Sequence, residues 1–505
     1  MKPTNWFGLE IKKSRNTLID KHLKGSIGLP FFPLFAMNKL FTNKAFFLLV
    51  FISSLFLSGC ATYYAQNEAF NQYFLTGDIT NAERTLDQDA KNHRNKNRSL
   101  YLLNKGTLAW MQQDYQKATN YFNEADLFIE DQRKNIANEA LALLTNPATK
   151  PYVPEDFENV MLNFYKALSY LEMGNTGSAL VECRRVNEKL YALNDKYPKN
   201  FKNRYSDDAF AHVLMGLIYD STKDYNNAFI AYRNALKIYE ENYTKNFGTA
   251  APLQLKEDLL RTAYQTGLTQ EYEFYREQFG FDYIKAKKKE GDLVFIWLTG
   301  LGPVKDEWSI NFSALNGTDG YLTMASEGED LNFPFYVGDM DNKTRNSLND
   351  LEFVRVAFPK YAERIPLYTE ASVIVNDSLS YPLDKAEDIN AIAFKTLRDR
   401  MLREMANSLL RLATKKALEN YARSQDDTVG FLVGVLNAVT EKADTRNWQT
   451  LPYSIHYSRI RLKEGENNLI LQVNSPDGLV KNQNVQIQIK SGETSFYTFQ
   501  NMETN

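Results

Sequence analysis

The sequence has few of the side chains from which catalytic and metal sites are usually built. Histidine occurs only at His22, His93, His212 and His456, and no two of these positions stand at a metal-ligand spacing. The H-E-x-x-H, G-x-S-x-G and Walker patterns are absent as well. We therefore expect no metal, no cofactor and no catalytic residue in this chain.

The apolar runs are too short to cross a membrane. The run at residues 45–57 has 13 residues, whereas an apolar helix needs about 20 to span a bilayer. Lys39 and Lys44 precede this run, and Leu57-Ser58-Gly59-Cys60 follows it. Basic residues, an apolar run and then small residues are the order of a secretory signal peptide.

Cysteine is nearly absent, since the chain has only Cys60 and Cys183. The small pair before Cys60 resembles a bacterial lipobox, which implies that the Cys60 thiol carries lipid (palmitate or a similar acyl chain) and begins the mature protein. With Cys60 lipidated, no intramolecular disulfide can form. The alternative is a short transmembrane anchor with an incidental cysteine. We expect translation to start at Met37 and residues 1–59 to be leader and signal peptide.

The residue after the cysteine is Ala61 rather than aspartate, which favours sorting to the outer membrane, on its periplasmic face. Two or three acyl chains hold a protein firmly on a bilayer. The full chain has no excess of positive charge, with a net charge of −3. This balance argues against a nucleic-acid partner, because nucleic-acid affinity depends on basic side chains that neutralise phosphates.

Small and aromatic residues recur at fixed offsets in the first half of the chain. Offsets 0, 12, 16 and 19 are occupied in three sets: Gly106, Ala118, Phe122 and Ala125; Ala167, Ala179, Cys183 and Val186; Gly216, Ala228, Tyr232 and Ala235. This is the tetratricopeptide pattern of helix pairs. We expect the small residues to let two helices approach closely, and the aromatic residue to fill the gap between neighbouring pairs. The alternative is a helical bundle that matches by chance.

Turn signals support this pattern. They stand at Gln113-Asp114, at Met173-Gly174-Asn175 and at Lys223-Asp224, and a weaker unit surrounds Gly77-Asp78. Two further helices are expected within Pro252–Phe279. The sets are 61 and 49 residues apart, against about 34 in an ideal repeat, so extra segments must lie between units. Cys183 replaces an aromatic residue and is most simply a small core residue, with a reactive thiol as the alternative.

The second half changes to short strand-like runs, beginning with the continuous apolar run at residues 292–298. The other expected strands are 308–312, 351–358, 371–376, 455–462, 468–473, 485–490 and 495–500. Helices are expected at 386–422 and 429–439; the second is too short to span a membrane and suits core packing better than membrane insertion. The fold class is therefore α+β, with a helical repeat domain at 60–285 and, at 286–505, a mainly antiparallel β domain interrupted by a helical pair at about 386–443.

Four segments together resemble an uncharacterised family of bacterial tetratricopeptide lipoproteins. They are Tyr152-x-Pro154-x-x-Phe157-Glu158, residues 179–185, Gly291–Val294 with Gly302–Lys305, and residues 443–452. The last segment, with its Asp-Thr-Arg-x-Trp-x-x-Leu-Pro order, is the most specific. The resemblance implies a fold and a compartment, but no activity and no catalytic residues.

Two clusters are candidate functional residues. Glu182, Arg184 and Arg185 could offer a guanidinium pair to a carboxylate of a partner; the alternative is an ion pair within or between repeats. Asp444, Arg446 and Trp448 could form a binding corner. A structural junction between the last helix and the terminal sheet is the favoured interpretation of this second cluster.

These observations favour a periplasm-facing outer-membrane lipoprotein that acts as a scaffold or adaptor in cell-envelope biogenesis. The repeats of residues 61–285 would bind a protein partner through their concave face, because such arrays present extended concave surfaces. Two alternatives stay open: an envelope enzyme, hydrolase-like, with its site in the C-terminal domain, and a structural subunit of a secretion or surface complex.

Overall fold

The structure is a computed structural model. It describes residues 62–89, 96–135, 147–195, 204–285, 287, 289–316, 321–326, 332–336, 353–376, 379–425 and 443–504. Residues Ala61–Asn505 form one compact unit. Two expectations, the lipidated Cys60 with its leader and the helix at 429–439, lie outside the described residues.

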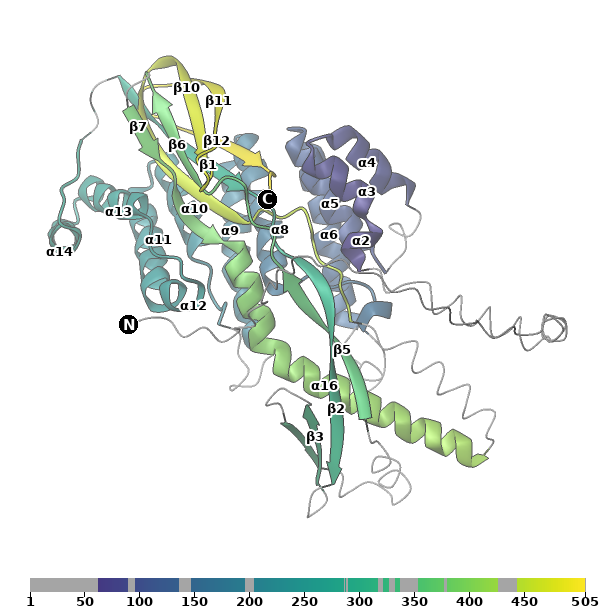
Figure 1. The fold of residues 1–505 in the computed structure, drawn as a ribbon. Helices are drawn as coiled ribbons and strands as arrows, with labels where there is room; N and C mark the ends of the chain where they lie inside the picture. Colours follow the sequence, from purple (N-terminus) through teal and green to yellow (C-terminus); the bar gives the residue numbers. More distant parts are fainter. Residues whose placement is uncertain are drawn as a thin grey trace, which may run out of the picture. The chain divides into compact units, whose positions relative to one another are not determined.

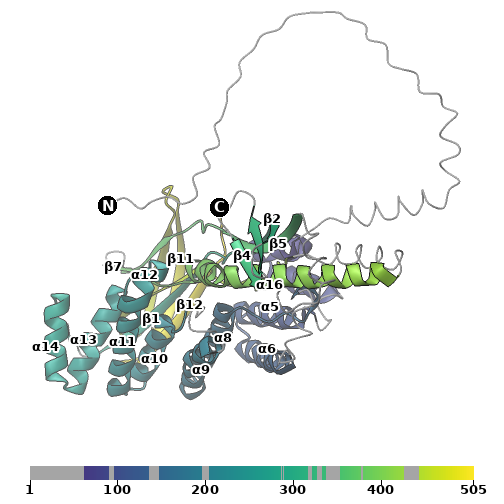
Figure 2. The ribbon, with the colours of Figure 1, turned by 90° about the horizontal axis from the view of Figure 1, so that it is seen from below.

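The first half consists of helix pairs that follow one another along the chain (Figure 1). The short helix α2 (Tyr63–Gln66) precedes the pairs. The pairs are α3 (Glu68–Leu75) with α4 (Ile79–Gln88), α5 (Arg98–Met111) with α6 (Tyr115–Asn135), α8 (Asp156–Glu172) with α9 (Thr176–Asp195), α10 (Ala209–Ser221) with α11 (Tyr225–Ile238), and α13 (Leu253–Thr266) with α14 (Thr269–Phe279). Each pair contacts the next one, and Figure 2 shows them in chain order from α5 to α14. This arrangement is tetratricopeptide-like, as the sequence predicts.

The first four pairs share one kind of turn. A residue with positive φ is followed by an aspartate or asparagine, at Gly77-Asp78, Gln113-Asp114, Gly174-Asn175 and Lys223-Asp224. The acidic or amide oxygen then accepts the backbone N–H three residues later, at 3.0–3.2 Å. Such a bond satisfies one of the N–H groups that are free at a helix start. The predicted turns are therefore confirmed. Helices α13 and α14 are followed by the C-cap glycines Gly267 and Gly280.

The small residue at offset 0 accommodates the aromatic residue at offset 16. A Cβ atom on Gly106 would lie 2.4 Å from the ring of Phe122, and one on Gly216 would lie 2.3 Å from the ring of Tyr232. The aromatic residue thus packs against the first helix of its own pair, a contact that the sequence analysis did not expect. Phe122 also reaches the next pair, since its ring centroid lies 5.8 Å from that of Tyr165.

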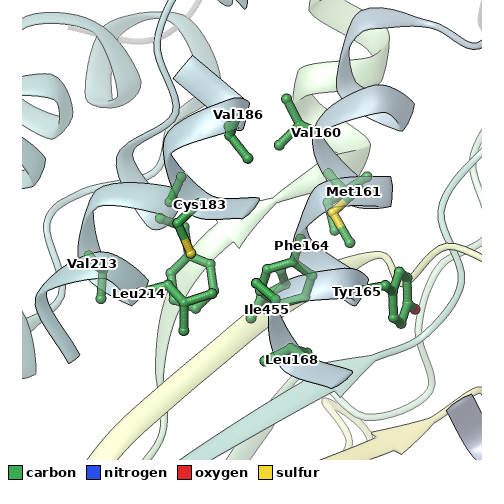
Figure 3. Close-up of a cluster of buried hydrophobic side chains, with 14 of the residues drawn as sticks. Val160, Met161, Phe164, Tyr165, Leu168, Cys183, Val186, Val213, Leu214 and Ile455 are labelled. Carbon is green, nitrogen blue, oxygen red and sulfur yellow. The ribbon is translucent and has the colours of Figure 1, made fainter. Parts of the chain in front are cut away.

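Cys183 stands in the core of the repeats. Figure 3 shows it among the buried side chains of Val186, Val213 and Leu214. Burial raises the pKa of its thiol far above the usual range. A buried thiol of raised pKa is not a reactive one, so the prediction of a small core residue is confirmed.

The described residues of the second half form three four-stranded sheets. Their strand orders are β12-β1-β9-β8, β11-β10-β6-β7 and β4-β3-β2-β5, and every pairing except the parallel pair β1–β12 is antiparallel. The strands are β1 Glu290–Thr299, β2 Val304–Asn316, β3 Tyr321–Ser326, β4 Asn332–Tyr336, β5 Phe353–Ala362, β6 Glu370–Val375, β7 Leu379–Pro382, β8 Asp384–Asp388, β9 Ser454–Lys463, β10 Gly465–Asn474, β11 Val480–Ile489 and β12 Thr494–Asn501. The strands β3, β4, β7 and β8 were not expected.

Strand β1 is buried on both faces, which explains its continuous apolar run. Its residues Leu293, Phe295 and Trp297 join the core between the first and second sheets. The alternate residues, such as Val294 and Ile296, join the core of the repeat helices. The first sheet therefore lies between the second sheet and the repeats.

The third sheet packs on the long helix α16 (Ile389–Gln425), which Figure 1 shows beside β2 and β5. Phe312 and Phe358 of the sheet share a core with Met405 and Leu409 of the helix. The first turns of α16, which include Ile392, instead join the core of the repeats. The helix therefore connects the repeats to the third sheet.

Candidate functional site

The first helices of the repeat pairs, which line the inner face of such an array, are in contact with the second half of the chain. Asn104 on α5 contacts Thr450 Oγ1 at 3.0 Å. Phe210 on α10 and Tyr457 on β9 have ring centroids 6.0 Å apart. The sequence suggested that the inner face forms an open concave groove. For these units that expectation is wrong, because the protein's own strands and the segment 443–453 pack against the inner face.

The segment 443–453 runs along α5 and α8. The backbone N–H of Trp448 donates to Glu158 Oε1 at 2.7 Å, and the indole lies 5.8 Å from the Tyr165 ring. The indole N–H donates to Thr450 Oγ1 at 2.8 Å, and the Trp448 side chain is fully buried. Trp448 is thus a core residue shared between the repeats and the second half.

Arg446 joins this segment to loops of the repeats. Its guanidinium is paired with Asp444 at 2.7 Å. It also donates to the backbone carbonyls of Lys96 at 2.8 Å, Lys150 at 3.0 Å and Pro147 at 3.1 Å. The Asp444–Arg446 pair thus contacts the segments before α5 and before α8. These contacts have a structural role, since they join the segment 443–453 to the repeats.

Two buried glutamates at the start of α8 contact the second half. Glu155 accepts hydrogen bonds from Lys305 on β2 and from Arg400 on α16. Burial opposes its ionisation, but these two cations outweigh burial and lower the pKa of Glu155 to about 2. Burial and the neighbouring Glu155 carboxylate raise the pKa of Glu158 to about 7. Glu158 is therefore a titratable group inside the contact between the repeats and segment 443–453.

The Glu182 cluster lies across three repeat helices. Glu182 is 4% exposed; its carboxylate contacts Lys166 at 3.0 Å and accepts from Asn163 at 2.6 Å. Arg185 lies 3.6 Å from Glu182 with its side chain 45% exposed, and Arg184 donates to the Tyr219 hydroxyl. The Glu182 carboxylate is thus enclosed within the repeats, and only the two arginines reach the surface.

A buried ionic network was missed from the sequence. Asp220 on α10, Asp258 and Arg261 on α13, and Arg459 on β9 are all less than a tenth exposed. Arg459 contacts Asp258 at 2.7 Å and Asp220 at 2.6 Å, and Arg261 contacts the same two carboxylates. The i, i+3 pair within α13 is visible in the sequence, but its partners are 41 and 201 residues away. We define these four residues as the α13 ionic network.

Beside this network lies an open pocket of about 600 Å³. The pocket is lined by residues of α13, by residues 281–285 and 287 after α14, and by parts of β1, β6, β7 and β9. We call it the α13 pocket.

Across the ranges that the structure covers, no three His, Cys, Asp or Glu side chains come close enough together to hold a metal ion. Within those same ranges, no helix combines the length and the apolar character that a membrane crossing requires. His456 is buried next to Ser454 and the Leu383 carbonyl, and burial lowers its pKa to about 4.

The solved structures that resemble this chain include distant neighbours at 14–18% identity. No family model and no curated protein matches the sequence. MamA (residues 41–end) from Desulfovibrio magneticus RS-1 is 17% identical with a TM-score of 0.26, covering 42% of this chain and 87% of MamA. BtubC from P. vanneervenii is 14% identical with a TM-score of 0.28, covering 43% and 81%. A tetratricopeptide repeat protein from Parabacteroides merdae ATCC 43184 is 14% identical with a TM-score of 0.19, covering 44% and 81%. At such low TM-scores the similarity carries no argument, so the tetratricopeptide-like description rests on the contacts between the helix pairs of this chain.

Proposed function

We propose that this chain is a lipid-anchored, non-enzymatic adaptor of the bacterial outer membrane that holds a protein partner on the periplasmic side during cell-envelope biogenesis. The observation that carries the proposal is the array of helix pairs with shared turns and shared small–aromatic contacts. Arrays of this kind present extended surfaces to other proteins. The large shared core with the sheets makes this array a rigid part of a larger body.

The anchor is proposed from the signal-like sequence before Cys60. The compact unit starts at Ala61. Thr62 caps α2 through its hydroxyl, which accepts from the N–H of Ala65 at 3.3 Å, and Tyr63 is already buried.

The partner surface cannot be the filled part of the inner face. Apolar side chains are exposed instead on the second helices of the pairs, at Leu127, Val181, Tyr191, Ile230 and Phe274. Arg184 and Arg185 lie on α9 in the same series of helices, and they could pair with a carboxylate of the partner. We therefore propose that the main partner surface lies on the second helices of the pairs, which we call the outer helices.

Membrane fractionation with capture tests this proposal. We expect the wild-type chain to partition into detergent and to capture a defined partner from crosslinked envelopes, whereas Cys60→Ala stays unprocessed or soluble. Equal partitioning of both forms would contradict the anchor. Hydrolysis of an envelope polymer by the purified protein, abolished by one carboxylate substitution, would replace the adaptor with an enzyme.

A further inference from the structure

One edge of the second sheet is a long strand without the features that usually protect such an edge. Strand β11 is ten residues long and stands at the end of the strand order β11-β10-β6-β7 (Figure 1). Lys481 is its only charged residue, and it contains no proline. Natural edge strands are usually short, charged, interrupted by proline or covered, because an unpaired edge is a template for pairing with another chain.

The other edge strands of the three described sheets each have one of these features. β7 has four residues and ends at Pro382, and β4 has five residues with Pro334 at its centre. β8 is mainly charged, and β5 contains Pro359. β12 is half-buried, because Phe496 packs against the core of the repeats and Phe499 against the core between the first and second sheets. Among these edges, β11 alone is long, exposed and nearly uncharged.

The outward backbone groups of β11 follow from its pairing with β10. Bonded residue pairs alternate with non-bonded pairs along an antiparallel ladder, and the Ser475 N–H donates to the Leu479 carbonyl at 2.9 Å. The even-numbered residues of β11 therefore direct their N–H and C=O groups away from β10: Val480, Asn482, Asn484, Gln486 and Gln488. Within the described residues these groups have no backbone partner, and the Asn484 carbonyl accepts only from the exposed Gln483 side chain, at 3.3 Å.

The side chains of these five residues carry no charge. They lie on the face opposite Val485 and Ile489, which join the core, and all five are exposed. Four of them are amides, and an amide offers both a donor and an acceptor. An amide side chain can therefore pair with a copy of itself, whereas a charged one facing its own copy would repel it.

A second β11, running antiparallel, fits this edge in a symmetric register. Asn484 then faces Asn484 of the second copy. Asn482 faces Gln486 of the second copy, and the outermost pair is Val480 with Gln488. All five outward residues are paired in this register, which gives about ten backbone hydrogen bonds. A shift of two residues in either direction leaves an outward residue of each strand without a partner in the other strand.

The apolar ends of β11 also match in this register. Leu479 and Val480 are 55% and 58% exposed where the strand begins, and Ile489 lies where it ends. Antiparallel pairing brings the start of one strand beside the end of the other, so Leu479 lies opposite Ile489 of the second copy. Apolar surface that each chain exposes alone is thereby covered in the pair.

We propose that the protein forms a two-fold dimer through antiparallel pairing of β11 with β11 of a second copy. The second sheets of the two copies then form one continuous sheet. Because both copies contribute the same patch, the contact closes at two chains. This inference goes beyond the proposed adaptor function and uses none of the outer helices.

The protein mass of the full chain in detergent, measured by size-exclusion chromatography with multi-angle light scattering, tests the dimer. We expect the wild type at twice the mass of one chain. Asn484→Lys places like charges on both sides of the two-fold axis and should raise the dissociation constant at least about tenfold. The matched control is Asn468→Lys: Asn468 on β10 is exposed and pairs with Gln486, so it lies on the same face but one strand further from the edge. The control should stay dimeric.

Mixing two variants tests the register. Asn484→Lys and Asn484→Glu should each be monomeric alone, whereas an equal mixture should form a mixed dimer, because opposite charges then face each other across the axis. Asn484 is exposed, so both variants should keep the circular dichroism spectrum of the wild type. A monomeric wild type, equal effects of Asn484→Lys and Asn468→Lys, or a mixture that stays monomeric would overturn the proposal.

Discussion

Replacing Gly216 with alanine tests the small–aromatic contact inside a helix pair. The added Cβ would lie 2.3 Å from the Tyr232 ring, where ordinary contacts are 3.4–4 Å. Tyr232 cannot easily move away, because it is fully buried and its hydroxyl contacts Arg459 at 3.3 Å and Asp220 at 3.5 Å. The ring is therefore held in place by the α13 ionic network.

Two opposing effects set the size of the change. Overpacking a tight core costs about 1–3 kcal/mol. Alanine in place of glycine inside a helix stabilises the helix by up to about 1 kcal/mol. We therefore expect Gly216→Ala to lower the free energy of unfolding by about 1–2 kcal/mol, and Gly216→Leu to lower it further.

Urea unfolding, followed by circular dichroism, measures this change. The control is Gly177→Ala on α9, where a Cβ would meet nothing closer than an Asn175 side-chain atom at 3.9 Å. This control should be neutral or slightly stabilising. A Gly216→Ala protein as stable as the wild type or the control would refute the contact. It would also refute the interpretation that the residues at offsets 0 and 16 pack against each other within a helix pair.

Three further outcomes follow from the contacts between the two halves and from the surface arginines. Burial and the Glu155 carboxylate raise the pKa of Glu158 from its ordinary 4.5 to about 7, so its protonated form favours the folded state. This stability is present below pH 4.5 and is lost as pH rises toward 7. Glu158→Gln should remove that decline, worth at most about 3 kcal/mol, and identical pH profiles of the two proteins would contradict it. Arg446→Ala should cost about 3 kcal/mol or more, because it removes the cation paired with Asp444 and the hydrogen bonds to three carbonyls. The exposed control Arg355→Ala should cost less than about 0.5 kcal/mol, and equal midpoints in urea would refute this. Replacing both Arg184 and Arg185 with alanine should weaken partner capture while costing less than about 1 kcal/mol, since both side chains are exposed; if that protein unfolds instead, the arginines are structural.

The sequence was sufficient where a feature depends on residues close along the chain. The turns at Gln113-Asp114 and Lys223-Asp224 follow from local hydrogen bonding by aspartate, and they were found. The 16-residue spacing of Gly216 and Tyr232 joins the two helices of one pair, which the repeat pattern already implies.

The filled inner face could not be found in this way. Trp448 and Glu158 are 290 residues apart, and Arg446 and Lys96 are 350 apart, so nothing local marks them as partners. The strand β8 was missed because Asp384–Asp388 is mainly charged and carries no β signature. Antiparallel pairing with β9 holds this segment as a strand, although its composition does not predict one.

Residue-specific crosslinking in living cells tests the adaptor most directly. A photoreactive amino acid is placed at Leu127 or Tyr191 on the outer helices, which are 66% and 69% exposed, and at Leu479 on the β10–β11 hairpin, which is 55% exposed. The account predicts a single discrete protein adduct from Leu127 and Tyr191, lost with Cys60→Ala, and no adduct of that mass from Leu479. No adduct from either repeat position, or equal adducts from all three, would contradict a partner surface on the repeats.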